Sequence, residues 1–199
     1  MPRRHRPAAA LAALAAATVL AGCGPLAEDE AAPPPDDAGI ASADADCPGA
    51  DREPDARGDA TFREAVRCLV NAERRARDLR ILEPHEALTR AAQRHSDDMA
   101  RRTYFAHESP DGTSVGDRAR DAGYTPRGLG RWQVGENIGW ASGGRVTARR
   151  LMRGWMESPS HRRNLLTPTH REMGVGVAFG SPGEGRPEGV MATQVFGSR

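Results

Sequence analysis

Three stretches of this chain place apolar residues three or four positions apart, which is the spacing of an amphipathic helix. The first starts near Asp59 or Thr61, either of which suits a helix N-cap. The second follows Pro84, and the third precedes Ser158-Pro159-Ser160. Their apolar faces are Phe62, Ala65, Val66, Leu69, Val70, Ala72 and Ala76; Leu88, Ala91, Ala92, His95 and Met99; and Ala148, Leu151, Met152 and Trp155. The pattern also predicts a short helix over residues 115–122.

Strand patterns lie between and after these helices. Residues 132–140 predict a strand and a turn, because Gly135-Glu136-Asn137-Ile138-Gly139 interrupts the apolar positions. Large apolar residues alternate with Gly and Ala over 173–179, and a second strand over 190–196 follows a Gly- and Pro-rich connection. This arrangement is typical of a β-hairpin. Helices followed by an antiparallel pair predict a layered α/β domain over residues 59–199, long enough to bury one core.

The N-terminus carries a pattern of a different kind. Three arginines precede an apolar run over residues 8–21, which is shorter than the roughly 20 residues that a membrane-spanning helix needs. A basic start and a short apolar run are typical of a secretory signal. The run ends at Leu20-Ala21-Gly22-Cys23, which resembles a lipobox. We therefore expect residues 1–22 to be a lipoprotein signal peptide and Cys23 to be lipidated. An ordinary signal peptide with a chance Cys is the alternative.

Residues 23–58 are rich in Ala, Pro, Asp and Glu and contain few large apolar side chains. Such a segment buries too little surface to offset its ordering entropy, so we expect a disordered tether behind the lipidated Cys. If Cys23 carries lipid, Cys47 and Cys68 are an even pair in an oxidising compartment. We expect them to form a disulfide, and two free thiols are the alternative.

The charged residues narrow the range of partners. The 28 basic residues are all Arg, and 27 Asp and Glu balance them to a formal net charge of +1. A nucleic-acid-binding protein needs basic residues clustered on one face, and here both signs are interspersed. The composition therefore argues against nucleic acid as a partner.

Several motifs along residues 60–197 are similar to the bacterial branch of the CAP superfamily, the SCP-like cysteine-rich secretory, antigen-five and pathogenesis-related-one proteins. They occur in the order of that family: Leu69-Val70-Asn71-Ala72-Glu73-Arg74, His95-Ser96-Asp97-Asp98-Met99-Ala100, Tyr104-Phe105-Ala106-His107, Ser109-Pro110-Asp111-Gly112, Gly135-Glu136-Asn137-Ile138, residues 155–166, Gly174-Val175-Gly176 and Thr193-Gln194-Val195-Phe196-Gly197. The resemblance implies a three-layer α-β-α sandwich of CAP type with a central antiparallel sheet and a cleft on one face.

In the family, that cleft holds two His and two acidic residues, and some members bind a divalent metal there. The matching residues are His107, Glu136 and His161, while the fourth position falls on Ser158, with Glu157 one residue away. Two imidazoles and a carboxylate are suitable zinc ligands, so the resemblance implies one divalent cation, zinc above all. The same three residues also suit general acid–base chemistry or hydrogen bonds between loops.

Other candidate residues have simpler interpretations. Gly112-Thr113-Ser114-Val115-Gly116 has the Gly-x-Ser-x-Gly spacing of a hydrolase nucleophile elbow, but a polar turn precedes it instead of a buried strand. We expect a turn that enters a helix. His95 lies on an apolar helix face, which predicts a core histidine with a hydrogen-bond partner.

These observations favour a membrane-anchored lipoprotein outside the cytoplasm, whose CAP domain binds a small ligand, a cell-envelope component or a divalent metal without established catalysis. One alternative is a metal-assisted hydrolase of cell-envelope material or protein, with Glu136 as the base. Another is a lipid- or sterol-binding protein.

Overall fold

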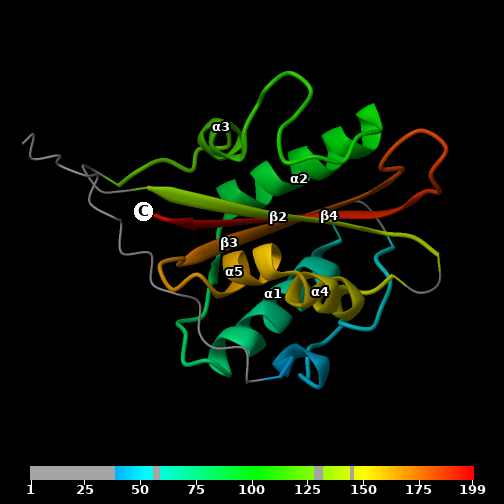
Figure 1. Ribbon diagram of the computed structural model, residues 1–199. Helices are drawn as coiled ribbons and strands as arrows, with labels where there is room; N and C mark the ends of the chain where they lie inside the picture. Colours follow the sequence, from blue (N-terminus) through cyan, green and yellow to red (C-terminus); the bar gives the residue numbers. More distant parts are fainter. Residues whose placement is uncertain (1–38, 56–58, 128–131, 144–145) are drawn as a thin grey trace, which may run out of the picture. The chain divides into compact units, whose positions relative to one another are not determined.

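A four-stranded sheet lies between two layers of helices in the computed structural model, which describes residues 39–55, 59–127, 132–143 and 146–199. Helices α2 (Glu86–Arg102) and α3 (Val115–Asp121) cover one face of the sheet, and α1 (Ala60–Arg75), α4 (Ala148–Glu157) and α5 (Pro159–Leu166) cover the other (Figure 1). This confirms the expected α-β-α sandwich. The predicted signal peptide, Cys23 and the first part of the tether lie outside the described residues.

The strand order is β1-β3-β4-β2, so β2 (Gln133–Ala141) lies at one edge. Strands β3 (Glu172–Gly180) and β4 (Gly189–Ser198) form the predicted hairpin, and β2 pairs antiparallel with β4. Strand β1 (Glu83–Pro84) contributes two residues that pair parallel with β3. The sheet is therefore antiparallel except at this short edge.

The predicted helices form where the apolar faces place them. Asp59 caps α1 by accepting a hydrogen bond from the Phe62 amide at 3.0 Å. His85 caps α2 in the same way, through Ala87, and the C-cap of α2 is Thr103, whose φ of 55° is left-handed. Helix α5 was not predicted, because Ser158-Pro159-Ser160 indicated only the end of α4. The proline instead occupies the first turn of a new helix, where its missing N–H costs nothing.

The two faces of the hairpin differ in side-chain size. Met173, Val175 and Val177 point into the larger core cluster with α1, α4 and α5. On the other face, a Cβ added to Gly174 would lie 2.1 Å from the Thr89 amide nitrogen of α2, and one added to Gly176 would lie 2.4 Å from the carbonyl carbon of Ala92. The glycines therefore allow the α2 backbone to lie directly on the sheet.

For residues 132–140 we expected a strand and a turn, and the turn is wrong. Strand β2 is continuous and pairs with β4 along all nine of its residues, from Gln133 to Ala141. Gly139 does not make a turn but leaves room for Trp155, whose indole nitrogen would lie 3.0 Å from an added Cβ. The glycine that suggested a turn is instead needed because α4 packs closely on the strand there.

The tether ends earlier than expected. We expected disorder through residue 58, but residues 39–55 pack against the domain and include a short 3₁₀ helix, Ala41–Ala43. Arg149 of α4 donates to the carbonyls of Ser42, Ala43 and Ala45, at 2.7, 3.1 and 3.2 Å. Hydrogen bonds from a distant side chain to the backbone of this segment hold it, and the scarcity of large apolar residues did not reveal them.

A disulfide fixes the same segment to α1. Cys47 and Cys68 are bonded with an S–S distance of 2.06 Å, as the cysteine count predicted. Cys47 is buried in the main core cluster together with Ala50. Within the described ranges, no helix is both long and apolar enough to span a bilayer.

The tight contact between α2 and β3 yields a test. Gly176→Ala should destabilise the fold by about 3 kcal/mol or more, because the new methyl group meets α2 backbone that cannot move aside. Gly154→Ala is the matched control, since an added Cβ there has nothing within 4 Å, and it should stabilise helix α4 by about 1 kcal/mol. Urea unfolding followed by circular dichroism measures both. Equal midpoints for the two variants would contradict the packing.

Candidate functional site

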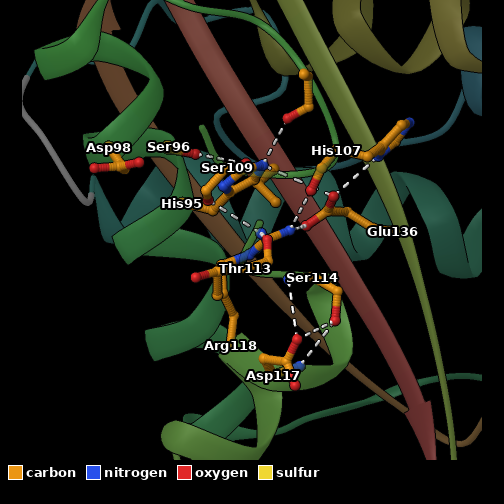
Figure 2. A network of polar contacts seen from close by, with 12 residues as sticks. His95, Ser96, Asp98, His107, Ser109, Thr113, Ser114, Asp117, Arg118 and Glu136 are labelled. Atoms are coloured by element: carbon orange, nitrogen blue, oxygen red, sulfur yellow. Dashed lines mark hydrogen bonds and ion pairs between the residues drawn. The ribbon is translucent and has the colours of Figure 1, made fainter. Parts of the chain in front are cut away.

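Glu136 lies at the centre of the candidate site, in the middle of edge strand β2. Its side chain is only 2% exposed. Its Oε1 accepts a hydrogen bond from His107 Nδ1 at 2.9 Å, and its Oε2 accepts one from Arg118 Nη2 at 2.8 Å. A buried carboxylate is costly unless it is paired and hydrogen-bonded, and both oxygens of Glu136 meet that condition. Figure 2 shows the His107 ring and the Arg118 guanidinium each reaching one oxygen.

His107 lies in the loop between α2 and α3, and 58% of its side chain is exposed. The turn Ser109-Pro110-Asp111-Gly112 shapes this loop, with the Gly112 amide donating to Ser109 O at 2.8 Å. Because an ionised carboxylate only accepts, Nδ1 of a neutral His107 carries the proton. Its Nε2 then has a free lone pair and no hydrogen-bond partner among the described residues.

Arg118 is the site residue that the sequence did not reveal. Its side chain is 8% exposed, and besides Glu136 it binds the carbonyls of His107 and Thr113, each at 2.8 Å. Helix α3 positions it through a capping box between Ser114 and Asp117. Arg118 therefore fixes the His107 loop and neutralises Glu136 at the same time.

His95 was expected to be a core histidine, and it is fully buried on α2. Its Nε2 bonds Ala106 O at 3.0 Å and lies 3.8 Å from Glu136 Oε1. Burial lowers the pKa of His95, while the Glu136 charge opposes that shift. The core interpretation is confirmed, but the residue also belongs to the surroundings of Glu136.

His161 reaches the site from α5. Asn137 donates to its backbone carbonyl at 3.1 Å, and Asn164 donates to Glu136 O at 2.9 Å, so two amide side chains connect α5 to β2. Burial, and then the charge of nearby His107, lowers the pKa of His161. The structure thus brings His107 and Glu136 into contact and places His161 within electrostatic reach of His107.

A hollow of about 470 Å³ opens beside His161. Its apolar walls come from Phe105 of the His107 loop, from β2 and from α4. The lining residues are Phe105, Ile138, Gly139, Trp140, Ala141, Ser142, Arg150, Leu151, Gly154, Trp155 and His161. The hollow therefore extends from His161 along the edge strand of the sheet.

Comparison with known proteins identifies the family. Residues 68–196 match CAP, the cysteine-rich secretory protein family. This chain belongs to the CAP family. The "Uncharacterized protein YkwD" of Bacillus subtilis (strain 168) is 35% identical over 108 residues, which are 54% of this chain and 39% of that protein. This chain thus matches well under half the length of that relative.

Solved structures agree with the assignment. An extracellular protein containing a SCP domain from Bacillus anthracis is 27% identical with a TM-score of 0.55, over 68% of this chain and 39% of that chain. An outer surface protein from Borrelia burgdorferi is 16% identical with a TM-score of 0.54, over 67% of this chain and 90% of that chain. The second likeness shows the fold alone. The CAP family and fold, as the motifs implied, are confirmed.

The CAP resemblance also implies a divalent metal ion. The side chains of His107, Glu136 and His161 are poorly arranged to bind such an ion. Both oxygens of Glu136 are engaged, and the Arg118 cation occupies one side of the carboxylate. Across the described ranges, no three His, Cys, Asp or Glu side chains are placed to hold one ion. Neither Glu157, which is exposed, nor Ser158, which lies beside Ser160, completes such a set. Metal binding by His107, Glu136 and His161 stays a prediction.

The arrangement suits proton transfer better than nucleophilic attack. A histidine oriented by a carboxylate, with its other nitrogen free, can accept a proton from a bound molecule. Ser114 is not an elbow nucleophile, because its hydroxyl caps α3 and binds Asp117 Oδ2 at 2.6 Å. The CAP site therefore presents an oriented base and an apolar hollow.

His170 gives the domain a testable response to acid. It is buried, stacks on Phe196 and bonds Asn164 O, and burial with the Arg74 charge lowers its pKa from 6.5 to about 4. Between pH 6.5 and pH 4, the His170 ring is protonated in the unfolded chain and stays neutral in the folded chain. Stability should therefore fall as pH drops from 6.5 to 4, by on the order of 3 kcal/mol from this residue.

Urea unfolding at several pH values measures the effect. His170→Gln keeps a donor for Asn164 O but does not titrate, so its stability should fall less steeply with acid than that of the wild type. Parallel curves for the two proteins across this window would contradict the assignment.

Proposed function

We propose that this protein is a membrane-anchored CAP-domain lipoprotein outside the cytoplasm, and that it binds a small amphipathic ligand with an anionic group. The observation that carries the proposal is the hollow beside His161, whose lining combines apolar side chains with the polar side chains of Ser142, Arg150 and His161. Ligand sites are commonly concave, mostly apolar and equipped with a few placed polar groups. Binding without established catalysis suits this site, where the described residues provide an oriented base and no evident nucleophile.

The apolar part of the ligand would lie between the loop and α4. Trp140 of β2 and Phe105 of the loop offer aromatic surface, and 39% of Phe105 is exposed. Trp155 is anchored by its indole nitrogen, which donates to Ile138 O at 3.1 Å. These walls are held before a ligand arrives, so little ordering entropy opposes binding.

The charges of the hollow favour an anion. Arg150 and His161 line it, and no carboxylate of the described residues does. The nearest acid of the site, Glu136, is buried and already paired with Arg118. A carboxylate or phosphate on the ligand would therefore meet the Arg150 guanidinium and the His161 imidazole, which can donate from one ring nitrogen. Acidic components of the cell envelope have this chemistry.

The location is proposed from the N-terminal motif and from the disulfide. Residues 20–23 resemble a lipobox, and the bond between Cys47 and Cys68 is typical of oxidising compartments outside the cytoplasm. The Bacillus anthracis relative is described as extracellular. Two acyl chains on Cys23 would suffice for stable membrane attachment.

Two alternatives stay predictions. A metal-assisted hydrolase would need a cation beside Glu136, where Arg118 now lies. A lipid or sterol binder would need a broad apolar surface. The exposed large apolar side chains of the described residues lie in three different elements or loops, at Ile81, Phe105 and Phe179.

Binding in the hollow can be measured with anilinonaphthalenesulfonate, a fluorescent anion with an apolar body. We expect the chain without residues 1–23 to bind about one equivalent. Trp140→Ala should weaken binding about tenfold, because aromatic contacts dominate the energy of such sites. Phe179→Ala is the matched control, since Phe179 is an exposed aromatic residue outside this hollow. Equal weakening by both variants would contradict the proposed site.

Calorimetric zinc titration of the same chain separates the metal hypothesis from this proposal. Binding of about one zinc that disappears in both His107→Ala and His161→Ala would support a metal site and overturn the argument from Arg118. Probe binding without zinc binding would support the ligand hollow.

The anchor has its own test. Metabolic labelling with a fatty-acid probe in a bacterial host should label the wild-type chain and not Cys23→Ser, because the thioether needs the Cys23 thiol. Undiminished labelling of Cys23→Ser would contradict lipidation at this residue.

A further inference from the structure

His95 and Arg118 each approach both Glu136 and the backbone of the His107 loop. His95 bonds the carbonyl of Ala106 at 3.0 Å, and Arg118 bonds the carbonyl of His107 at 2.8 Å. These two carbonyls belong to the residue before His107 and to His107 itself. Each of the two buried side chains also faces Glu136, at 3.8 Å from Oε1 and 2.8 Å from Oε2. The carboxylate and the His107 loop are therefore located by one pair of side chains.

His95 can locate the loop because its own position is rigid. Its side chain is fully buried in α2, and the next residue, Ser96, donates to Thr193 Oγ1 of β4 at 2.9 Å. Strand β4 pairs directly with β2, where Glu136 lies. His95 is thus fixed relative to Glu136 through hydrogen bonds that do not involve the loop.

The protonation state of His95 follows from its partners. A carbonyl oxygen only accepts, so Nε2 of His95 carries the proton that reaches Ala106 O. Its Nδ1 is buried and has no hydrogen-bond partner within the described residues. A neutral ring is consistent with this, and burial lowers the pKa of His95. The ring therefore acts as a single donor directed at the loop.

We propose that His95 is a positioning residue that holds the His107 backbone so that His107 Nδ1–H meets Glu136 and Nε2 stays available to a ligand. Loss of the Ala106 bond would release the loop, because Ala106 O would be left without its buried donor. His107 would then exchange between tautomers instead of keeping the one that Glu136 selects. This role does not depend on which ligand the hollow takes.

Nitrogen-15 NMR of the histidine rings tests the proposal on the ligand-free chain without residues 1–23, at about pH 8, which is above the ordinary histidine pKa of about 6.5. In the wild type, His107 should show one tautomer with the proton on Nδ1. His95→Leu, which fills space but cannot donate, should give a mixture of both tautomers. It should also speed hydrogen exchange of the Tyr104 amide, which donates to Met99 O at 3.2 Å at the start of the loop, about tenfold. His95→Gln, whose amide can donate to Ala106 O, should restore the wild-type signals.

A stability control separates positioning from general destabilisation. Val66→Ala truncates a fully buried side chain on α1, across the sheet from His95, and should lower stability without changing the His107 tautomer. An unchanged tautomer in His95→Leu would overturn the proposal, and so would a mixture in a folded His95→Gln. Because no ligand is present, failure here is distinct from failure of anilinonaphthalenesulfonate to bind.

Discussion

The buried ion pair between Glu136 and Arg118 is the constraint on which the rest of the site depends. A carboxylate that is 2% exposed needs a partner, and a guanidinium that is 8% exposed needs several acceptors. Arg118 finds them in Glu136 and in the carbonyls of His107 and Thr113. The His107 loop and helix α3 must therefore come to β2. Removing either partner would leave a buried charge, so the arrangement is held as a unit.

The sheet supports this unit differently on its two faces. Large side chains of β3 fill the core with α1, α4 and α5, while Gly174 and Gly176 let α2 lie against the sheet backbone. The close approach brings His95 to within 3.8 Å of Glu136. On the opposite face, α4 and α5 supply Trp155 and His161 to the hollow. The site thus forms where the edge strand meets both helical layers.

Much of this fold could be predicted from the sequence, and the site only in part. Spacing of apolar residues found α1 to α4, because one face of each helix is buried. The alternation of large apolar residues with Gly and Ala found the hairpin, because large side chains fill one of its faces and α2 lies directly on the other. Motif resemblance found His107, Glu136 and His161. Arg118 was missed because an arginine in a short, charged helix has no local signal of burial; only the tertiary fold places it on Glu136. The packed segment 39–55 was missed for a related reason, since distant groups such as Arg149 hold its backbone.

Arg118 also limits the chemistry of the site. A divalent cation beside Glu136 would face a fixed positive charge whose other donors hold the loop, so the cation cannot displace Arg118 without releasing His107 O. An anionic ligand meets no such conflict, because Glu136 is already neutralised and no carboxylate of the described residues lines the hollow. His107, oriented by Glu136 and exposed to solvent, can then accept a hydrogen bond from the ligand through Nε2. The same ion pair that stabilises the loop therefore favours ligand recognition over metal binding.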